Sequence, residues 1–357
     1  MRVLYFGTYE RSHPRNAQVI SCLRRAGVDV IERHEPVWEG QEHKFRAGAA
    51  AGLRLAAAEI RLRRRIESDG DSRFDAVVVG YPGHLDLGAA RLTAGARPVV
   101  FNPLVSLADT LVDDRRRFPP GSLPARALGA IDRRAFRAAN LVVADTAAQA
   151  ELFLALGARR VGVCFVGAEE RVFRPGWDPP DGFGFTALFV GKLIPLHGLD
   201  TVLAAARLAP EIRFRVVGSG QLQHLLDGRP ANVEHVPWVR YEALPDELHR
   251  ASCALGIFGT SAKAARVIPN KAFQALACGT PLVTGDTPAA RELVRDGESA
   301  LLVPPGNAGA LADALRHLAA DRRLADSLSD GGLTAYREQA SEDVLGVRWR
   351  DLIGSLL

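Results

Sequence analysis

At 357 residues, 47% of them hydrophobic, the chain is long enough to bury two ordinary cores. Its formal net charge is only +4 at pH 7, and no apolar run reaches the roughly 18 residues that a membrane span needs. The four cysteines, Cys22, Cys164, Cys253 and Cys278, form no CxxC pair, so we expect free thiols in a reducing compartment and neither a zinc site nor a disulfide framework. The amino terminus, MRVLYFG, is typical of a strand rather than of a signal peptide, which predicts a cytoplasmic protein.

Short apolar runs alternate with helical periods along the whole chain. In the first half we expect strands at Arg2–Phe6, Val28–Ile31, Ala76–Val79, Pro98–Phe101, Leu141–Val143 and Val161–Phe165. In the second half we expect them at Ala187–Val190, Arg213–Val217, Val233–Val236, Ala254–Ile257, Pro281–Thr284 and Ala300–Val303. Such alternation predicts an α/β protein with parallel sheets covered on both faces, arranged as two doubly wound domains.

The segment RPGWDPPDGF, residues 174–183, interrupts both periods and predicts a linker. We therefore expect a first domain at 1–173, a second at 184–338 and a separate last helix at 339–357. Ser341 is expected to cap that helix, since Glu342 and Asp343 follow in its first turn. The apolar residues of this segment recur at helical spacing and must pack on another part of the protein: Leu345, Trp349, Leu352, Ile353 and Leu356.

Charge is unevenly distributed. Residues 1–175 hold 27 Lys and Arg against 20 Asp and Glu, a net +7; the remainder holds 18 against 21, a net −3, which together give +4. Arginines gather at Arg61, Arg63, Arg64 and Arg65, at Arg115–Arg117, and at Arg133, Arg134 and Arg137. Two interpretations stay open: solvated helix faces, or a surface that meets an anionic lipid leaflet or a phosphorylated acceptor.

Ligands of open parallel sheets bind outside the carboxyl ends of the strands, so the residues that follow each strand are informative. Gly7 follows the first strand, but no GxGxxG pattern follows it, which argues against a nicotinamide or flavin cofactor. Lys192 follows the seventh strand, and His197-Gly198 precedes a helix at Leu199–Leu208. A lysine beside a helix amino terminus can hold an anion; a solvated lysine at a turn is the alternative.

Two further loops follow strands of the second half. Gly218 and Gly220 could let a ligand approach the backbone closely. Trp238 and Val239 could present a stacking face and main-chain groups to a base, although Trp238 as a core residue is an equal alternative.

Residues 268–306 are the most informative segment. Only Lys44, Lys192, Lys263 and Lys271 are lysines, and Lys271 opens a helix that ends at Gly279. A cation is disfavoured at a helix amino terminus unless an anion binds there. Gln274 lies one turn later on the same face, so the pair could hold a phosphate and a sugar hydroxyl. A second helix is expected to begin near Thr287-Pro288.

The second half, roughly residues 180–330, resembles the nucleotide-sugar-binding domain of group 1 retaining glycosyltransferases with the GT-B fold. The resemblance rests on FVGKLIPLHGLDTVLAAA (189–206), FRVVGSGQ (214–221), VPWVRYEALPDELHRA (236–251) and residues 268–306. Gln274–Pro281, QALACGTP, matches the family's glutamate-alanine-x-alanine-x-glycine-x-proline core. Residues 166–169 and 173–175 are similar to its domain junction, and the rest of the first half matches only in layout.

The resemblance implies two Rossmann-like domains facing across a cleft, with the last helix crossing back to the first domain. It implies that Lys192 and His197 contact the donor diphosphate, and that Gln274 and Arg266 replace the family's two glutamates near the ribose and the transferred sugar. The expected donor-binding residues are Gly7, Lys192, His197, Gly218, Gly220, Trp238, Val239, Arg266, Ile268, Asn270, Lys271 and Gln274.

The acceptor is then expected to bind to the first half of the chain. Asp109 and His84 follow strands there, and we prefer Asp109 as the residue that faces sugar and acceptor, with Lys192 as the third catalytic candidate. No convincing DxD motif follows a strand, so no metal and no cofactor beyond the sugar donor are expected.

The predicted function is retaining, metal-independent glycosyl transfer from a nucleoside-diphosphate sugar to a glycan, a lipid-linked glycan or a small molecule. No nucleic-acid partner is expected, and peripheral contact with the inner face of an anionic membrane stays open. The alternatives are a nucleotide-sugar epimerase or hydrolase of the same fold and a non-catalytic nucleotide-sugar-binding protein.

Overall fold

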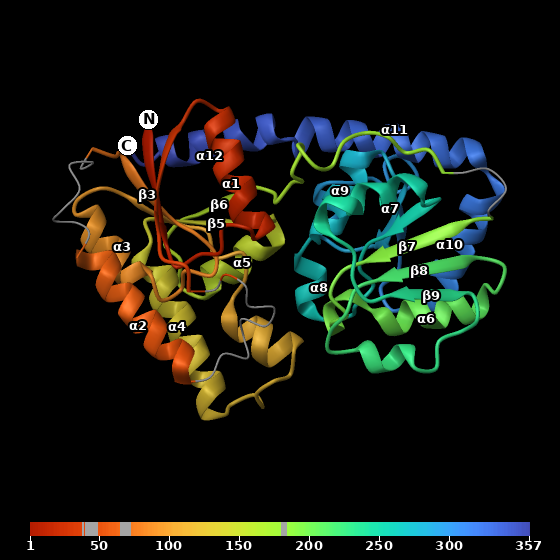
Figure 1. The fold of residues 1–357 in the computed structure, drawn as a ribbon, viewed down its shortest axis with the longest axis horizontal. Helices are drawn as coiled ribbons and strands as arrows, with labels where there is room; N and C mark the ends of the chain where they lie inside the picture. The colour runs from red at the N-terminus through yellow and green to blue at the C-terminus, as the bar shows by residue number, and fades with distance from the viewer. Residues whose placement is uncertain (38, 40–48, 65–72, 180–183) are drawn as a thin grey trace. The chain divides into compact units, whose positions relative to one another are not determined.

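The structure, a computed structural model, describes residues 1–37, 39, 49–64, 73–179 and 184–357. It divides into two compact units (Figure 1). Unit 1 comprises Met1–Val112, Arg116–Val166 and Glu342–Leu357, and unit 2 comprises Asp113–Arg115 and Gly167–Ser341. Each unit is built around a six-stranded parallel sheet, as the alternation of strands and helices predicts.

The sheet of unit 1 has the order β2-β1-β3-β4-β5-β6. Its strands are β1 Arg2–Gly7, β2 Asp29–His34, β3 Ala76–Val79, β4 Val99–Phe101, β5 Leu141–Ala144 and β6 Val161–Val163. The predicted boundaries differ most at β2, which continues to His34 because it pairs with β1 along its whole length, from Arg2↔Asp29 to Gly7↔His34.

Both faces of this sheet are covered by helices, because the residues of β1 alternate between two cores. Leu4 and Phe6 pack with residues of α2, α3, α4 and α5, whereas Val3 and Tyr5 pack with residues of α1 and α12. These helices are α1 Pro14–Arg25, α2 Ala49–Arg64, α3 Leu87–Ala94, α4 Leu123–Ala138, α5 Ala147–Ala155 and α12 Glu342–Gly354, and a π-helical segment, η2, spans Asp109–Asp114.

The last helix, α12, belongs to unit 1, which confirms the predicted return of the chain. It lies against α1 so closely that a side chain at Gly346 would come within 2.3 Å of the Cys22 carbonyl oxygen. Leu345, Trp349 and Ile353 are buried in this contact. The Ser341 hydroxyl donates back to the Arg337 carbonyl at 2.9 Å, at the end of α11.

The sheet of unit 2 has the order β12-β11-β10-β7-β8-β9. Its strands are β7 Thr186–Val190, β8 Arg213–Val217, β9 Val233–Val236, β10 Cys253–Leu255, β11 Leu282–Gly285 and β12 Leu301–Val303. Its α-helices are α6 Leu199–Leu208, α7 Leu244–Arg250, α8 Ala262–Arg266, α9 Asn270–Cys278, α10 Ala308–Ala320 and α11 Arg322–Gln339, with 3-10 turns at Pro195–His197, Gln223–Leu226, Tyr241–Ala243 and Ala290–Glu292. All twelve predicted strands are present.

The helix predicted near Thr287-Pro288 is wrong in length: the structure has a single 3-10 turn, Ala290–Glu292. The Thr287 hydroxyl accepts from the Ala290 amide at 3.1 Å, as a helix cap would. The chain then turns again at Arg295–Ser299, where the Ser299 amide donates to the Arg295 carbonyl, and this turn leads directly into β12.

The boundary between the units follows Val166, several residues before the predicted linker 174–183. Residues 180–183 of that segment lie outside the described residues. Trp177 is fastened to unit 2, because its indole donates to the Ala251 carbonyl at 2.8 Å, and the Gly176 amide donates to the Cys278 carbonyl.

Among the described residues, the four cysteines are buried free thiols. No described helix combines the length and the apolar character that crossing a membrane requires.

Candidate functional site

A buried ammonium group marks the candidate site in unit 2. Lys271 lies in the first turn of α9, only 8% exposed, and its Nζ lies 3.5 Å from the centroid of the Phe189 ring of β7. Within the part of the chain that the structure describes, this Nζ has no hydrogen-bond partner. A buried cation that only an aromatic face stabilises is costly, so the site is suited to an anion.

Gly191 makes this arrangement possible. It follows β7 with φ +141°, a conformation that favours glycine. A Cβ at this position would lie 3.2 Å from the His197 Cε1 atom and 3.3 Å from the Lys271 Cε atom. The imidazole and the lysine side chain therefore converge over the backbone at the carboxyl end of β7, where ligands of such sheets bind.

The surroundings disfavour the charged forms of both basic groups. Burial lowers the pKa of Lys271 well below its usual value. Burial also lowers the pKa of His197 well below its usual value, and the neighbouring Lys271 charge lowers it further. The His197 ring hydrogen-bonds with the backbone of Lys192, and its Nδ1 is buried without a described partner. A bound anion would reverse these shifts, because it favours the charged forms.

The glycines that follow β8 bring two loops into backbone contact. Gly218 has φ +138°, and a Cβ there would come within 2.0 Å of the Gly191 carbonyl oxygen. Gly220 has φ +157°, and its Cβ would meet the Leu193 carbonyl oxygen at 2.7 Å. Close packing of the loops explains both glycines without a ligand, so donor contact at these positions stays a prediction.

Gln274 is buried next to two residues that the sequence did not single out for the site. The Tyr241 hydroxyl interacts with Gln274 and with the Glu169 carboxylate. Burial raises the pKa of Tyr241, so the phenol stays protonated as a donor. Tyr241 thus connects a carboxylate, Glu169, to the position where the family motif would carry its second glutamate.

The other predicted donor residues of unit 2 differ in exposure. Trp238 is 71% exposed, so the core alternative is wrong, and its ring is open to solvent after β9. Arg266 ends α8 and is half-buried, as are Val239 and Asn270, whereas Ile268 is buried and Lys192 is exposed. Contact of these residues with a donor stays a prediction.

Gly7 in unit 1 has a structural explanation. It has φ +128°, and a Cβ there would lie 2.2 Å from Asp86 Oδ2. That carboxylate accepts from the Thr8 amide at 2.6 Å and from the Thr8 hydroxyl. The absence of a side chain at Gly7 is therefore explained by the space that the Asp86 carboxylate occupies.

The two acceptor-side candidates share one network in unit 1. The His84 ring is enclosed, with Nδ1 2.7 Å from the Pro82 carbonyl and Nε2 3.1 Å from the Val105 carbonyl. Asp132 of α4, fully buried, accepts from the Ser106 hydroxyl at 2.6 Å and from two backbone amides.

The Ser106 hydroxyl in turn accepts from the Asp109 amide at 3.1 Å, at the start of η2. Asp132 therefore holds the loop that presents Asp109, a role that sequence reasoning missed. In the sequence, the only sign of this role is that Asp132 is a single acid among the arginines of α4. The catalytic roles of Asp109, His84 and Lys192 stay predictions.

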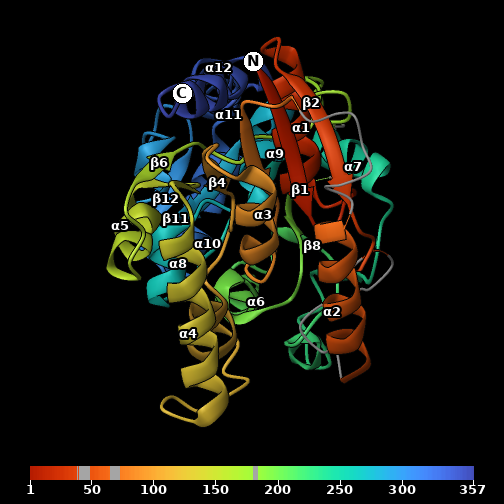
Figure 2. The same cartoon turned by 90° about the vertical axis from the view of Figure 1, so that its left-hand side faces the viewer.

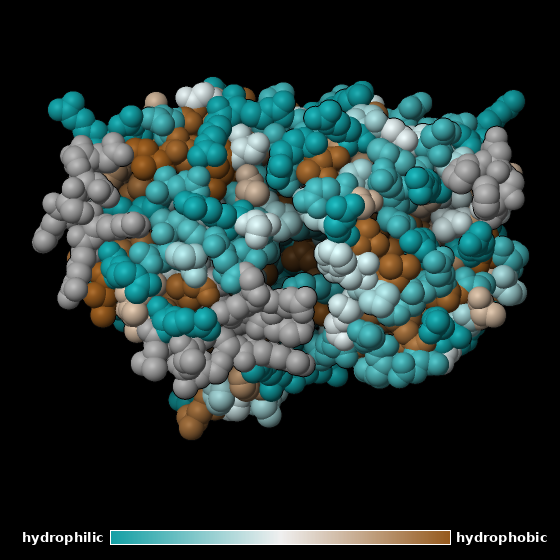
Figure 3. Space-filling model, in the orientation of Figure 1, coloured by the Kyte–Doolittle hydropathy of each residue, from teal (hydrophilic) through white to brown (hydrophobic). Residues whose placement is uncertain are grey.

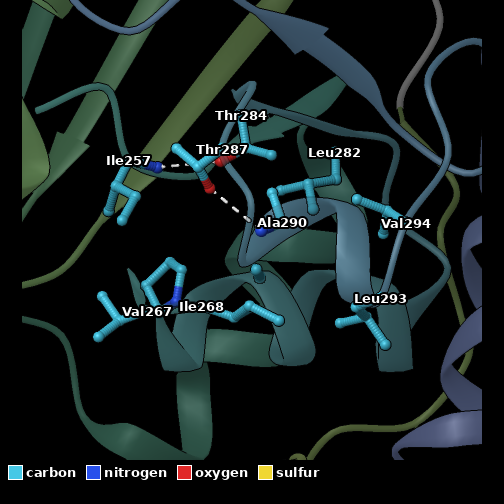
Figure 4. Close-up of a pocket in the computed structure, with 11 residues that line it drawn as sticks. Ile257, Val267, Ile268, Leu282, Thr284, Thr287, Ala290, Leu293 and Val294 are labelled. Carbon is cyan, nitrogen blue, oxygen red and sulfur yellow. Dashed lines mark hydrogen bonds between the residues drawn. The ribbon is translucent and has the colours of Figure 1, made fainter. Parts of the chain in front are cut away.

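A small apolar pocket lies at the start of α9 in unit 2 (Figure 4). Its polar groups are occupied, because the Thr284 hydroxyl accepts from the Ile257 amide at 3.3 Å and the Thr287 hydroxyl accepts from the Ala290 amide. Of the predicted donor residues, only Ile268 lines it. The pocket is therefore separate from the candidate anion site at Lys271 and His197.

Residues 184–321 match the family model described as "Glycosyl transferases group 1". The matched segment contains Lys271, His197 and Gly191, so the two basic groups lie inside the part of the chain that is similar to this family.

The chain is also similar to curated proteins. The chain is 32% identical to a phosphatidyl-myo-inositol mannosyltransferase of Mycobacterium leprae over 43% of this chain and 42% of the relative. It is 28% identical to a GDP-mannose-dependent alpha-mannosyltransferase of Mycobacterium tuberculosis over 95% of this chain and 89% of the relative. The chain spans half the length or less of the first curated relatives that it matches.

Solved structures with the same fold cover the whole chain. HepE of Anabaena, in complex with UDP and glucose, gives a TM-score of 0.72 at 16% identity, covering 100% of both chains. Sucrose-phosphate synthase from Thermosynechococcus elongatus gives 0.75 at 15% identity, covering 99% of this chain and 98% of the other. At such identities the likeness establishes the fold, which is GT-B.

Proposed function

We propose that the protein is a glycosyltransferase that moves a sugar from a nucleoside-diphosphate sugar to a glycan, a lipid-linked glycan or a small-molecule acceptor. The observation that carries this proposal is the buried Lys271 ammonium, which has no described hydrogen-bond partner and lies beside His197 in a group 1 glycosyltransferase domain. The similarity to mannosyltransferases and the shared fold of proteins solved with UDP or UDP-glucose support it.

The chemistry follows from the leaving group. When the bond between sugar and phosphate breaks, negative charge grows on the diphosphate. Lys271 and His197 stabilise that charge best if they are positioned before the reaction, because no reorganisation is then needed. Burial disfavours the charged forms of both groups, whereas a bound diphosphate favours them and would gain two charge-assisted contacts.

The proposal has three further parts. The sugar keeps its anomeric configuration, the reaction needs no metal, and the catalytic residues are Asp109, His84 and Lys192. Asp109 would face the sugar and the acceptor, held in place by Ser106 and Asp132. We further propose a cytoplasmic location, with peripheral contact to the inner face of the membrane and no nucleic-acid partner.

The test is transfer of sugar from uridine, guanosine and adenosine diphosphate sugars to a panel of glycan, glycolipid and small-molecule acceptors. We expect release of nucleoside diphosphate only with a matching acceptor, and an NMR spectrum of the product that shows the anomeric configuration of the donor. Inversion would refute retention, and an absolute requirement for a divalent cation after chelation would refute metal independence.

A second candidate is a non-catalytic nucleotide-sugar-binding protein, because Gln274 and Arg266 stand where the resembled family carries two glutamates. The carboxylate of Glu169 next to Tyr241 and Gln274 speaks against a complete loss of acidic function there. Donor binding without transfer or hydrolysis across the acceptor panel would favour this candidate. Donor rearrangement without an acceptor would favour an epimerase.

A further inference from the structure

A row of arginines on α4 and its leading loop differs from the other charged surfaces of the chain. Residues 116–137 contain six arginines and one acid, Asp132, which is fully buried. None of these six arginines forms an ion pair with any described residue, and all six are exposed: Arg116, Arg117, Arg126, Arg133, Arg134 and Arg137.

Elsewhere on the described surface, many arginines form ion pairs with nearby Asp or Glu side chains. Ion pairs of this kind include Arg2–Asp29, Arg24–Glu32, Arg61–Glu35, Arg291–Asp286, Arg316–Glu211 and Arg322–Asp326. The chain is rich in arginine throughout, so abundance alone does not explain α4. What sets α4 apart is that its arginines gather in one place and that none of them forms an ion pair with a described acid.

The arginines of α4 share one helix face. Arg126, Arg133 and Arg137 are spaced by seven and four residues, which places them in one line. At 1.5 Å per residue this line is roughly 16 Å long. The opposite face of α4 is fixed to unit 1 by Ala135 and Phe136 in the core, so the orientation of the row is set by the fold.

An apolar tip precedes the row. Leu123, the first residue of α4, is 79% exposed, and the prolines at 119, 120 and 124 beside it are exposed too. The loop that leads into α4 lies below the sheet of unit 1 in both ribbon views (Figures 1 and 2). In the space-filling view, hydrophobic atoms lie at this lower tip (Figure 3).

We propose that this face of α4, with its apolar tip, docks unit 1 onto an anionic lipid surface. Charges spread along a line fit a planar array of phosphates, whereas a single phosphate group is held by donors that converge on one point. An exposed leucine beside the row adds apolar contact at the level of the lipid headgroups. The proposal does not depend on glycosyl transfer.

The test is co-sedimentation of the full chain with vesicles of phosphatidylcholine alone or mixed with phosphatidylglycerol. We expect binding only to the mixed vesicles, falling steeply between about 0.1 and 0.5 M salt because screening shortens the range of the charges. The test variant carries Arg126→Gln, Arg133→Gln, Arg134→Gln and Arg137→Gln, and we expect it to bind mixed vesicles at least about tenfold more weakly.

A matched control separates the α4 face from total charge. It carries Arg207→Gln, Arg295→Gln, Arg323→Gln and Arg337→Gln, four exposed arginines of unit 2, and should bind like the unaltered protein. Equal binding of the unaltered chain to neutral and mixed vesicles, or equal loss in both variants, would overturn the proposal. Unchanged thermal midpoints show that both variants fold, and nucleotide affinity should stay the same in both.

Discussion

The Lys271 ammonium lies 3.5 Å from the centroid of the Phe189 ring, although the two residues are separated by a large part of unit 2 in sequence. The aromatic face offsets part of the cost of burying the charge, but it does not replace a hydrogen bond. This contact therefore links the stability of unit 2 to the occupancy of its anion site.

Replacing Lys271 by methionine should weaken nucleoside-diphosphate binding by about 10- to 100-fold, since a hydrogen bond to a charged group contributes about 1.5–3 kcal/mol. The same change should leave the ligand-free fold equally stable or more stable, because it removes a buried polar group that has no described hydrogen-bond partner. Calorimetric titration with nucleoside diphosphates and thermal unfolding measure the two effects. Unchanged nucleotide affinity in Lys271→Met would refute the proposal that Lys271 contacts the phosphates.

Gly191→Ala should lower both stability and nucleotide affinity. The substitution places a Cβ at φ +141°, a strained conformation that costs about 1–3 kcal/mol, and crowds the Lys271 and His197 side chains. Gly297→Ala is the control, since Gly297 also has a positive φ of 71° but would meet nothing within 4 Å. Both variants should lose stability in urea unfolding, and only Gly191→Ala should lose affinity.

A pair of carboxyl groups in unit 1 predicts a pH dependence of stability. Burial raises the pKa of Glu59 to about 8, and the neighbouring Asp86 carboxyl contributes. Because the folded pKa lies above the ordinary value, the protonated pair stabilises the fold fully below about pH 4.5, and this contribution is lost as the pH rises through 8. Thermal midpoints should fall over this range, and Glu59→Gln should flatten the fall. If the thermal midpoint of Glu59→Gln fell with pH as steeply as that of the unaltered protein, Glu59 would not be the group responsible.

Asp132→Ala should destabilise unit 1 by about 2–4 kcal/mol, because it leaves the Ser106 hydroxyl and two amides without their buried acceptor. Asp132→Asn retains one acceptor oxygen and should cost less. If Asp109 faces the acceptor, Asp132→Asn should also lower kcat in transfer assays more than it changes the affinity for the donor nucleotide. Equal stability of the alanine variant and the unaltered protein would refute this role.

The sequence by itself determined the twelve strands and the two parallel sheets, because the spacing of apolar residues is a local property that burial selects directly. The return of the last helix to the first domain was implied by the family resemblance, and the motif around Gln274 lies in the segment that the family model matches. Boundaries at β2 and at Ala290–Glu292 departed from expectation where strand pairing or a following turn overrode the local pattern.

Only the tertiary structure decided which of the polar residues have partners. That Lys271 lies against Phe189, that Tyr241 interacts with both Gln274 and Glu169, and that Asp132 holds the Asp109 loop depend on contacts between residues distant in sequence. The same holds for the arginines of α4, whose lack of ion pairs with described residues is visible only in the folded protein. Pairing of charges is a property of the packed surface, and no local pattern encodes it.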